Sequence, residues 1–564
     1  MLYLMFIATL LICCLPLLPG LLGILLPALS WLPFAGLTHP GPQAFYQALA
    51  WPGLSASVLL TLSTGVVSTV LALAFTFLIL QRYWGSHRWQ QIESWLSPML
   101  AIPHVAFAIG FAFTFSSTGI IARLIATFGG DPGQLSLLQD PYGIGLTLAL
   151  AIKETPFLLL MSISVLQQLN VGRLLAAGNG LGYNRASTWL NVILPQWLPR
   201  MRLPIYAVLA YGISVVDMAM ILGPTRPPTF AVLVWQWFNE PDVALLPRAA
   251  VGAFMLLMLG LCLLAVFRAL EWLILRGFQG WQYAGHRKQR LPGRYFHWPL
   301  IAVPLLVTPV LMLWSVALRW RFPDLLPSRF SVQFWQQETA VFTELASTSL
   351  MLAGISTAIA LCLAIGCLEY RDKTGTGIPG WLLAMPMVLP QVSLLFGIQI
   401  TTYMIPGQHH LLWVIWSHVL FVFPYLYLAL DGPWRSFDRR YTQTANSLGL
   451  SELQAWWRVK RPMLMPAICL ALAVGASVSL AQYLPTLSLG AGRVSTLTTE
   501  AVALASGQDR RVSAIYGLLQ GLVPFILFAL ATFASRYYQS KMTSGNYTRN
   551  AKANVLVSQK PHYK

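Results

Sequence analysis

The sequence predicts an all-α, polytopic membrane protein in which about 12 transmembrane helices form two parallel six-helix repeats. Only 10% of the 564 residues are charged, whereas soluble domains carry about 25%. Long apolar runs, such as 58–80 and 351–368, reach the roughly 20 residues that cross a bilayer as a helix. These runs lack the alternation of a membrane barrel. Helices also satisfy every backbone group internally, as lipid requires.

An internal repeat supports the same fold, because the second half of the chain matches the first at a constant shift of 267 residues. Rare residue types coincide without a gap in the pairs Asn179/Asn446, Leu181/Leu448, Gly182/Gly449, Trp189/Trp456, Val192/Val459, Pro195/Pro462, Pro199/Pro466, Gly223/Gly490, Thr229/Thr496 and Asp242/Asp509. The match continues upstream with small insertions in the pairs Pro103/Pro390, Val105/Val392 and Gly110/Gly397. Chance rarely aligns Trp, Gly and Pro together, so we interpret the chain as a duplication.

The repeat divides the chain into four parts. We expect a first six-helix half over 1–275, a basic cytoplasmic linker over 276–297, a second half over 298–536 and a disordered basic tail over 537–564. The expected spans of the first half lie near 4–29, 55–80, 96–116, 142–167, 203–223 and 249–275. Those of the second half lie near 298–318, 345–368, 380–404, 411–431, 466–490 and 514–536. No Lys or Arg precedes the first apolar run, so it predicts an uncleaved helix rather than a signal peptide.

The distribution of basic residues sets the orientation. With both termini inside, 25 of the 36 Lys and Arg fall in inner loops and the tail, 9 in outer loops and 2 within spans. The positive-inside rule therefore predicts that both termini are cytoplasmic. Six helices separate equivalent points of the two halves, so the halves share one orientation and the repeat is parallel.

Cysteine use and net charge give no sign of a cofactor, a metal or a nucleic-acid partner. All six cysteines lie inside apolar runs and lack metal-ligand spacing. The net charge of +18 is spread between helices rather than gathered in one patch. The expected surroundings are a lipid bilayer.

The best-kept part of the repeat is a polar loop, at about 170–202 in the first half and 433–465 in the second. In each copy small residues precede a glycine, which ends a short helix at little cost in backbone strain. Nine residues then separate Gly182 from Val192, and Gly449 from Val459. A proline follows, Pro195 or Pro462, which we expect to stop the second turn before the next span. Alternatively, the loops are solvated connectors with small residues for turns.

Both loops resemble the E-A-A-x(3)-G-x(9)-I-x-L-P loop of permeases in binding-protein-dependent ABC importers. The chain is similar to the fused two-half members of that family, the thiamine and ferric-iron types, and above all to the Ynj-type inner-membrane permeases. The resemblance implies the type I permease fold in a bacterial inner (plasma) membrane, with each loop seated in a groove of a cytoplasmic ATPase. The residues that would form these ATPase-coupling loops are Ala176, Ala177, Gly178, Gly182 and Pro195, and Gln443, Thr444, Ala445, Gly449 and Pro462. The family's glutamate is Ala176 in one copy and Gln443 in the other, so a carboxylate contact with the ATPase is missing.

Partners follow from what the chain lacks. No G-x-x-x-x-G-K-[S/T] phosphate-binding loop occurs, so the chain is not expected to be an enzyme and ATP hydrolysis would belong to a separate subunit. The paired loops predict two copies of that ATPase, and the resemblance implies a periplasmic or extracellular solute-binding protein. The candidate outer segments for contacting it are 224–248 and 491–513, unless these are packed caps.

Ionisable and polar residues inside the spans are candidates for the translocation path. They are Lys153, Glu154, Asp217 and Gln482. Adjacent residues of a helix point about 100° apart, so Lys153 and Glu154 cannot simply neutralise each other. Misplaced span ends, or pairing with another helix, would explain the same residues. Arg268 and Glu271, three apart, predict a local ion pair.

The sequence thus predicts the permease subunit of an ATP-driven importer that moves a small solute inward by alternating access. The alternative is a 6+6 secondary transporter driven by an ion gradient. That class should use several carboxylates within its spans, and only Glu154, Asp217 and the marginal Glu271 are present. It also gives no reason for paired glycine-proline loops. A membrane-embedded enzyme would need clustered His, Asp or Cys, whereas the nine histidines are scattered. The substrate is not indicated, and thiamine and ferric iron are suggested by kinship alone.

Overall fold

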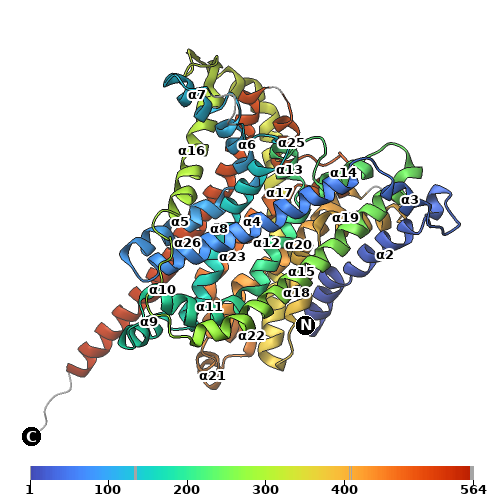
Figure 1. Cartoon of the computed structure of the whole chain (residues 1–564). Coiled ribbons are helices and arrows are strands. Elements are labelled where there is room, and N and C mark those ends of the chain that lie inside the picture. The colour runs from blue at the N-terminus through green and yellow to red at the C-terminus, as the bar shows by residue number, and fades with distance from the viewer. Residues whose placement is uncertain (1, 132–135, 406, 408, 508, 559–564) are drawn as a thin grey trace, which may run out of the picture.

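The computed structural model describes residues 2–131, 136–405, 407, 409–507 and 509–558 as a bundle of tilted helices (Figure 1). The helices of the first half are α1 (Leu2–Thr9), η1 (Leu10–Cys14), α2 (Leu17–Ala28), η2 (Pro33–Ala35), α3 (Gln43–Leu49), α4 (Leu54–Tyr83), α5 (His87–Ala101), α6 (His104–Phe115), α7 (Ile120–Thr127), α8 (Ile144–Gln168), α9 (Val171–Gly180), α10 (Arg185–Thr188), η4 (Trp189–Ile193), α11 (Leu194–Trp197), η5 (Leu198–Met201), α12 (Arg202–Ser214), α13 (Asp217–Leu222), α14 (Phe230–Phe238), η6 (Val243–Leu245) and α15 (Leu246–Tyr283).

The second half contains the two short strands of the described chain, β1 (Ala317–Arg319) and β2 (Arg329–Phe330), which pair antiparallel. Its helices are α16 (His297–Val316), α17 (Gln333–Thr374), α18 (Gly380–Val388), α19 (Gln391–Tyr403), α20 (His410–Ser436), α21 (Arg440–Ser447), α22 (Glu452–Ala455), η7 (Trp456–Lys460), α23 (Arg461–Leu480), α24 (Leu484–Gly490), α25 (Leu497–Ala505) and α26 (Arg510–Ser558). Residues 559–564 of the expected tail lie outside the described residues, and disorder of the tail stays a prediction.

The all-α membrane fold is confirmed. Within the described residues, ten helices are long and apolar enough to cross a membrane, or eleven when the bent pair α18–α19 counts as one span. The remaining expected span, 203–223, is divided between α12 and α13.

Four expected spans were wrong as continuous helices, and they form two equivalent pairs. Spans 96–116 and 380–404 break just before α6 and α19, and the second pair bends by 92°. Proline has no N–H and disfavours the helical region for the residue before it. Accordingly Ile102 and Leu389 are extended, ahead of Pro103 and Pro390.

The other two interrupted spans, 203–223 and 466–490, break between α12 and α13 and between α23 and α24. The break in the second half precedes Pro485, at the second position of α24. In the first half Val215 is extended without a neighbouring proline. All four interruptions therefore lie at matching places in the two halves.

The repeat of 267 residues is reproduced element by element. The pairs α10/α22, η4/η7, and α14/α25 have the same bounds after the shift, and α13 and α24 begin at the same point. The π-helical turns η4 and η7 are an informative pair, because π-helical turns are rare and are frequently found at functional sites.

The two halves interlock through their first helices. Helix α2 packs against α19 of the second half, and α16 packs against α6 of the first half. The contacts use equivalent glycines: a Cβ on Gly397 would lie 1.7 Å from the Gly20 carbonyl oxygen, and one on Gly110 would lie 2.2 Å from Val307. Each half therefore completes the packing of the other.

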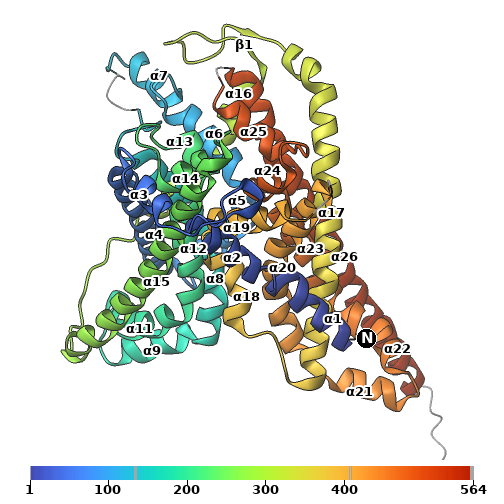
Figure 2. The same ribbon diagram turned by 90° about the vertical axis from the view of Figure 1, so that its right-hand side faces the viewer.

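The ends of the molecule differ in what they present. Helices α9, α11, α21 and α22 lie at one end, whereas α7 and the β1–β2 hairpin lie at the opposite end (Figure 2). Both polar repeat loops consequently face one side, as a parallel repeat requires.

Candidate functional site

Each polar repeat loop is a helical elbow closed by a left-handed glycine. Gly182 has φ +80° and Gly449 has φ +88°, a conformation that glycine adopts without the strain that a Cβ causes. The second limb of each elbow starts with a side-chain cap: Asn184 accepts a hydrogen bond from the Ser187 N–H at 2.8 Å, and Ser451 accepts from the Gln454 N–H at 3.3 Å. The glycine expected to end each first helix does so in both copies.

The elbows expose the same positions. Ala176, Ala177, Gln443 and Thr444 are exposed, whereas Gly178 and Ala445 are buried. At the tip, Leu181 is 67% exposed and its counterpart Leu448 is 79% exposed. The two exposed leucines thus lie at equivalent positions of the repeat. Their recurrence in the repeat was the available signal, but the sequence did not identify them as site residues.

The prolines act differently from the sequence expectation that they stop a turn. Pro195 and Pro462 each occupy the second position of a new helix, α11 and α23. The π turn before them is closed by the Leu194 N–H donating to the Trp189 carbonyl, and in the second copy by Arg461 donating to Trp456. Proline is tolerated at a helix start because its missing N–H has no intrahelical partner there.

The first elbow is strapped by the linker between the halves. The Asn184 N–H donates to the Arg287 carbonyl at 2.9 Å, and the Asn184 side-chain amide donates to the Gln289 carbonyl at 2.8 Å. In return, the Gln289 N–H donates to Ser187 Oγ at 3.1 Å. Gln282, at the end of α15, also donates to the Asn191 carbonyl.

Arg185 fixes the same elbow to the end of α4. Its guanidinium donates to the Gln81 carbonyl and, at 2.7 Å, to the Trp84 carbonyl. Burial lowers the pKa of Arg185, and neighbouring Arg82 lowers it further. The first elbow is thus held mainly by backbone carbonyls.

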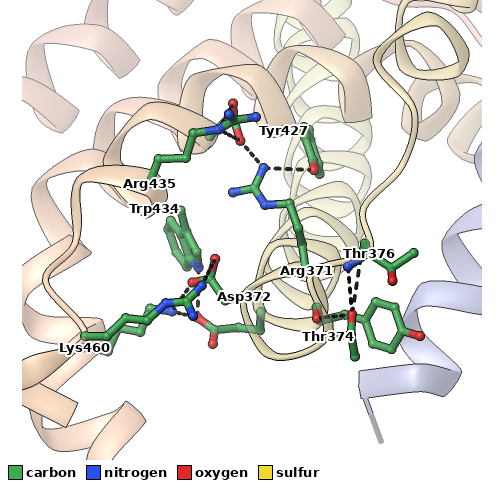
Figure 3. A network of polar contacts seen from close by, with 12 residues as sticks. Arg371, Asp372, Thr374, Thr376, Tyr427, Trp434, Arg435 and Lys460 are labelled. Atoms are coloured by element: carbon green, nitrogen blue, oxygen red, sulfur yellow. Dashed lines mark hydrogen bonds and ion pairs between the residues drawn. The ribbon is translucent and has the colours of Figure 1, made fainter. Parts of the chain in front are cut away.

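The second elbow is held by a network of charges instead (Figure 3). Lys460, at the end of η7, is buried and pairs with Glu369 at 2.7 Å and Asp372 at 2.9 Å. Glu369 also accepts hydrogen bonds from the indole N–H groups of Trp434 at 2.9 Å and Trp456 at 3.0 Å. Every charge in this core has a partner, which buried ions require.

Further ion pairs extend the network along α17, all within the described residues. Arg371 pairs with Asp431, which also binds Arg435 at 2.9 Å. Lys373 pairs with Glu452 at the start of α22. The end of α17 is therefore tied to the second elbow and to α20.

The corresponding positions of the first half are uncharged. The segments Ser68–Leu80 and Ser356–Leu368 align, which places Gln81 opposite Glu369, and the shift of 267 places Ile193 opposite Lys460. In the first half Gln81 Oε1 and Trp189 Nε1 are buried without a hydrogen-bond partner among the described residues. The two elbows share a shape but differ in what anchors them.

Lys153 and Glu154 lie side by side on α8 and reach the two sides of the α5–α6 break. Lys153 Nζ donates to the Met99 carbonyl at 3.0 Å, near the end of α5. Glu154 Oε1 accepts from His104 Nε2 at 2.9 Å, at the first residue of α6. A cation at a helix C-terminus and an anion at a helix N-terminus both suit the helix dipole. As the sequence indicated, the Lys153 and Glu154 side chains thus do not pair with each other. Instead, they bind polar groups on the two sides of the α5–α6 break.

Asp217 and Gln482 also lie at breaks. Asp217 is the first residue of α13 and accepts a hydrogen bond from the Met218 N–H at 2.9 Å. Gln482 lies between α23 and α24, and its side-chain Oε1 accepts a hydrogen bond from Gln391 Nε2 at 3.1 Å. The hydroxyl of the neighbouring Tyr483 lies 3.9 Å from Met220 Sδ, which joins the break before α24 to α13. All four path candidates therefore lie at the interruptions or contact them. The α18–α19 and α23–α24 breaks meet through Gln391 and Gln482, and Tyr483 contacts α13 of the first half.

Within the described residues, no three His, Cys, Asp or Glu side chains gather as a metal site would need.

The expected pair of Arg268 and Glu271 is confirmed at 3.1 Å. Arg202 joins it, at 2.8 Å from Glu271.

The segments 224–248 and 491–513, which the sequence predicted to be outer, each contain a packed helix. Phe230–Val234 of α14 are buried, and most of α25 is buried from Leu497 to Val502. The first backbone N–H of each helix donates to a hydroxyl group on another helix. The Phe230 N–H donates to Thr61 Oγ1 at 2.7 Å, and the Leu497 N–H donates to Ser349 Oγ at 3.0 Å. The packed cap describes the buried parts of α14 and α25, whereas residues 241–244 and 491–493 are exposed, so contact of these parts with a solute-binding protein stays a prediction.

Comparison with known proteins covers nearly the whole chain. No protein-family model matches the sequence. The chain is 33% identical over 533 residues, 93% of its length, to 94% of the inner membrane ABC transporter permease protein YnjC of Escherichia coli strain K12. A spermidine/putrescine transport system permease protein PotC homolog of Mycoplasma genitalium is 29% identical over 27% of this chain and 55% of its own. The molybdenum transport system permease protein ModB of Mycobacterium bovis is 26% identical over 37% of this chain and 80% of its own.

Proposed function

The chain belongs to the family of ABC transporter permeases, and from this premise we propose that it is the membrane-spanning subunit of an ATP-driven importer. It is a multi-pass inner-membrane protein. In the proposed cycle, it moves a small solute into the cytoplasm by alternating access, and the ATP is hydrolysed by two copies of a separate subunit.

The observation that carries the proposal is the matched pair of elbows. Both present an exposed leucine at the tip, a left-handed glycine beside it and a π turn behind it. Two equal knobs on one side of a parallel repeat fit two equal grooves of a paired ATPase. Ala176 and Gln443 replace the expected carboxylate, so apolar contact at Leu181 and Leu448 becomes the main attachment.

Coupling would run from the elbows to the helix breaks. The first elbow is bonded to the end of α4 and the second to the end of α17, so closure of the ATPases would move both long helices. The path residues Lys153, Glu154, Asp217 and Gln482 lie where the neighbouring spans are interrupted. Interrupted spans of this kind surround substrate sites in other transporters. The distribution of basic residues supports cytoplasmic termini and elbows.

The test is purification of the tagged chain in mild detergent with its native partners, followed by mass spectrometry. We expect an ATPase at about two copies per chain. Leu181→Asp with Leu448→Asp should abolish this association, because the charged side chains cannot enter an apolar groove.

The matched control is Leu181→Met with Leu448→Met, which keeps the apolar volume and should retain the ATPase. Normal ATPase recovery with the aspartate pair would show that the elbows are not the attachment. An active preparation that never contains an ATPase would favour the ion-driven alternative.

A further inference from the structure

The hairpin between α16 and α17 lies at the end opposite the elbows (Figure 2). Its strands pair Ala317 with Phe330 and Arg319 with Arg329. The corresponding segment of the first half, 29–53, contains no Lys or Arg and forms α3 instead. The hairpin is therefore an asymmetric addition to a repeated fold.

The hairpin is rigidly mounted. Trp320 donates from its indole N–H to the Asp324 carbonyl at 2.9 Å and stacks near Trp314, with ring centroids 4.6 Å apart. From α7, the Arg123 guanidinium donates to the carbonyls of Arg321 at 2.8 Å and Asp324 at 2.5 Å. At the other side Arg511 donates to the Leu318 carbonyl at 3.3 Å. A protruding segment fixed by backbone bonds loses little conformational entropy when it binds a partner.

The outward face of the hairpin combines arginine with apolar side chains. Arg319, Arg321 and Arg329 are exposed, and within the described residues no hydrogen-bond or ion-pair partner is found for their guanidinium groups. Leu326 is 61% exposed and Phe330 is 59% exposed. Arginine and aromatic residues are enriched where protein interfaces gain most of their binding energy.

The charge of this face limits the kinds of partner that it can bind. The segment 317–332 holds three arginines, no lysine and one acidic residue, Asp324. Basic residues are normally depleted on the outer side of a membrane protein, so a cluster there indicates a function. Arginine binds carboxylates through two parallel hydrogen bonds.

We infer that this hairpin is the docking surface for an acidic, partly apolar face of the solute-binding protein that delivers the cargo. The inference rests on the proposed importer function and its orientation. Because only one half carries the hairpin, one binding protein docks per chain. Carboxylates of the partner pair with Arg319, Arg321 and Arg329, and an apolar pocket receives Leu326 or Phe330.

The experiment places a photo-crosslinking amino acid at Leu326 or Phe330 of the full chain in intact cells. The control position is Tyr46 on α3, which is 69% exposed on the corresponding segment of the first half. We expect both hairpin positions, and not Tyr46, to crosslink to a soluble solute-binding protein through a peptide that is rich in Asp and Glu.

Charge variants then test the recognition. Arg319→Glu, Arg321→Glu and Arg329→Glu together should lower the crosslink yield from Leu326 at least about tenfold, the effect of losing one strong interface contact. The same three positions changed to Lys keep the charge and should retain most of the yield. Recovery of the ATPase with each variant verifies that the chain is folded.

Three results would overturn the inference while leaving the importer intact, provided the ATPase co-purifies: crosslinks from Tyr46 alone, adducts with lipid alone, or no binding protein from any position. A crosslink yield from Leu326 that is unchanged in the variant with all three Arg→Glu substitutions would also overturn the inference. Absence of both the binding protein and the ATPase would instead reject the proposed function itself.

Discussion

At the scale of single residues, the two limbs of each elbow touch at one pair of small residues. The residue types of this pair differ between the two halves. In the first half a Cβ on Gly178 would lie 2.4 Å from Thr188 Oγ1. In the second half the equivalent residues are Ala445 and Ala455, both buried. One half uses glycine with threonine, and the other uses two alanines to fill a similar space.

We therefore expect Gly178→Ala to destabilise the first elbow by about 1–3 kcal/mol, because overpacking forces the neighbouring turn apart. Adding Thr188→Ala should restore stability by recreating the second-half pair. Thermal unfolding in detergent measures both. Gly172→Ala on the same helix meets nothing within 4 Å and serves as the control. A double variant no better than the single one would show that the pair does not act together.

The buried charges of the second elbow allow a similar exchange. Lys460→Ile alone leaves Glu369 and Asp372 without their buried cation, and we expect a loss of about 3–5 kcal/mol. Glu369→Gln together with Lys460→Ile reproduces Gln81 and Ile193 of the first half and should recover much of that loss. Denaturant unfolding of the single and double variants gives the coupling. Equal losses in both would contradict the role assigned to the Lys460–Glu369 pair.

At the scale of helices, close packing of glycines joins the halves. A Cβ on Gly23 would lie 2.0 Å from the Gly397 carbonyl oxygen, and no side-chain movement can relieve a clash with backbone. Small residues allow this approach in membranes, where contact and packing drive helix association.

Gly397→Ala should accordingly separate α2 from α19 and lower stability by about 1–3 kcal/mol or more. Gly354→Ala, at an exposed position of α17, meets nothing within 4 Å and should stabilise by up to about 1 kcal/mol through helix propensity. The difference between their unfolding temperatures is the measurement. An unchanged Gly397→Ala protein would mean that this contact is not tight in the membrane.

The helix breaks show which features of the fold can be predicted from the sequence and which cannot. Hydrophobic run length predicted where nearly all spans lie, and the repeat predicted that equivalent loops share a face. Pro103 and Pro390 also carried a signal for their breaks, because proline constrains its predecessor. Val215 carried none, since a β-branched residue in an apolar run is ordinary within membrane helices.

The candidate site was predictable to a similar degree. The elbow residues stand out because glycine and proline recur at fixed spacing. The anchors of the elbows could not be predicted, because Glu369 and Lys460 lie far apart in sequence and meet only in the fold. Gln289 likewise reaches the first elbow across a long sequence separation.

At the scale of the whole molecule, the linker straps one elbow while the first helices interlock the halves. Asn184→Ala removes a linker bond together with a helix cap. We expect trypsin to cut faster at Arg287, Lys288 and Arg290 in this variant. Ser451→Ala removes only the equivalent cap and should leave the cutting rate unchanged, as limited proteolysis can show.

The cut protein should remain one particle. Helix α2 stays packed on α19 and α16 on α6, so the two fragments should elute together by size exclusion in mild detergent. Separate elution would show that the covalent linker, rather than the interlock, holds the halves together.

The interlock also has a consequence during biosynthesis. Gly20 meets Gly397, and at about 5–20 residues per second the ribosome needs roughly twenty seconds to more than a minute to make the intervening chain. For that interval the first helix waits in the bilayer without its partner, its glycine face open to lipid or to a chaperone. Helix α15 of the same half can pack against α2 before then, but the glycine face of α2 stays uncovered until α19 is inserted. A truncated translation product would keep that face open, and quality-control proteases would have a feature to recognise.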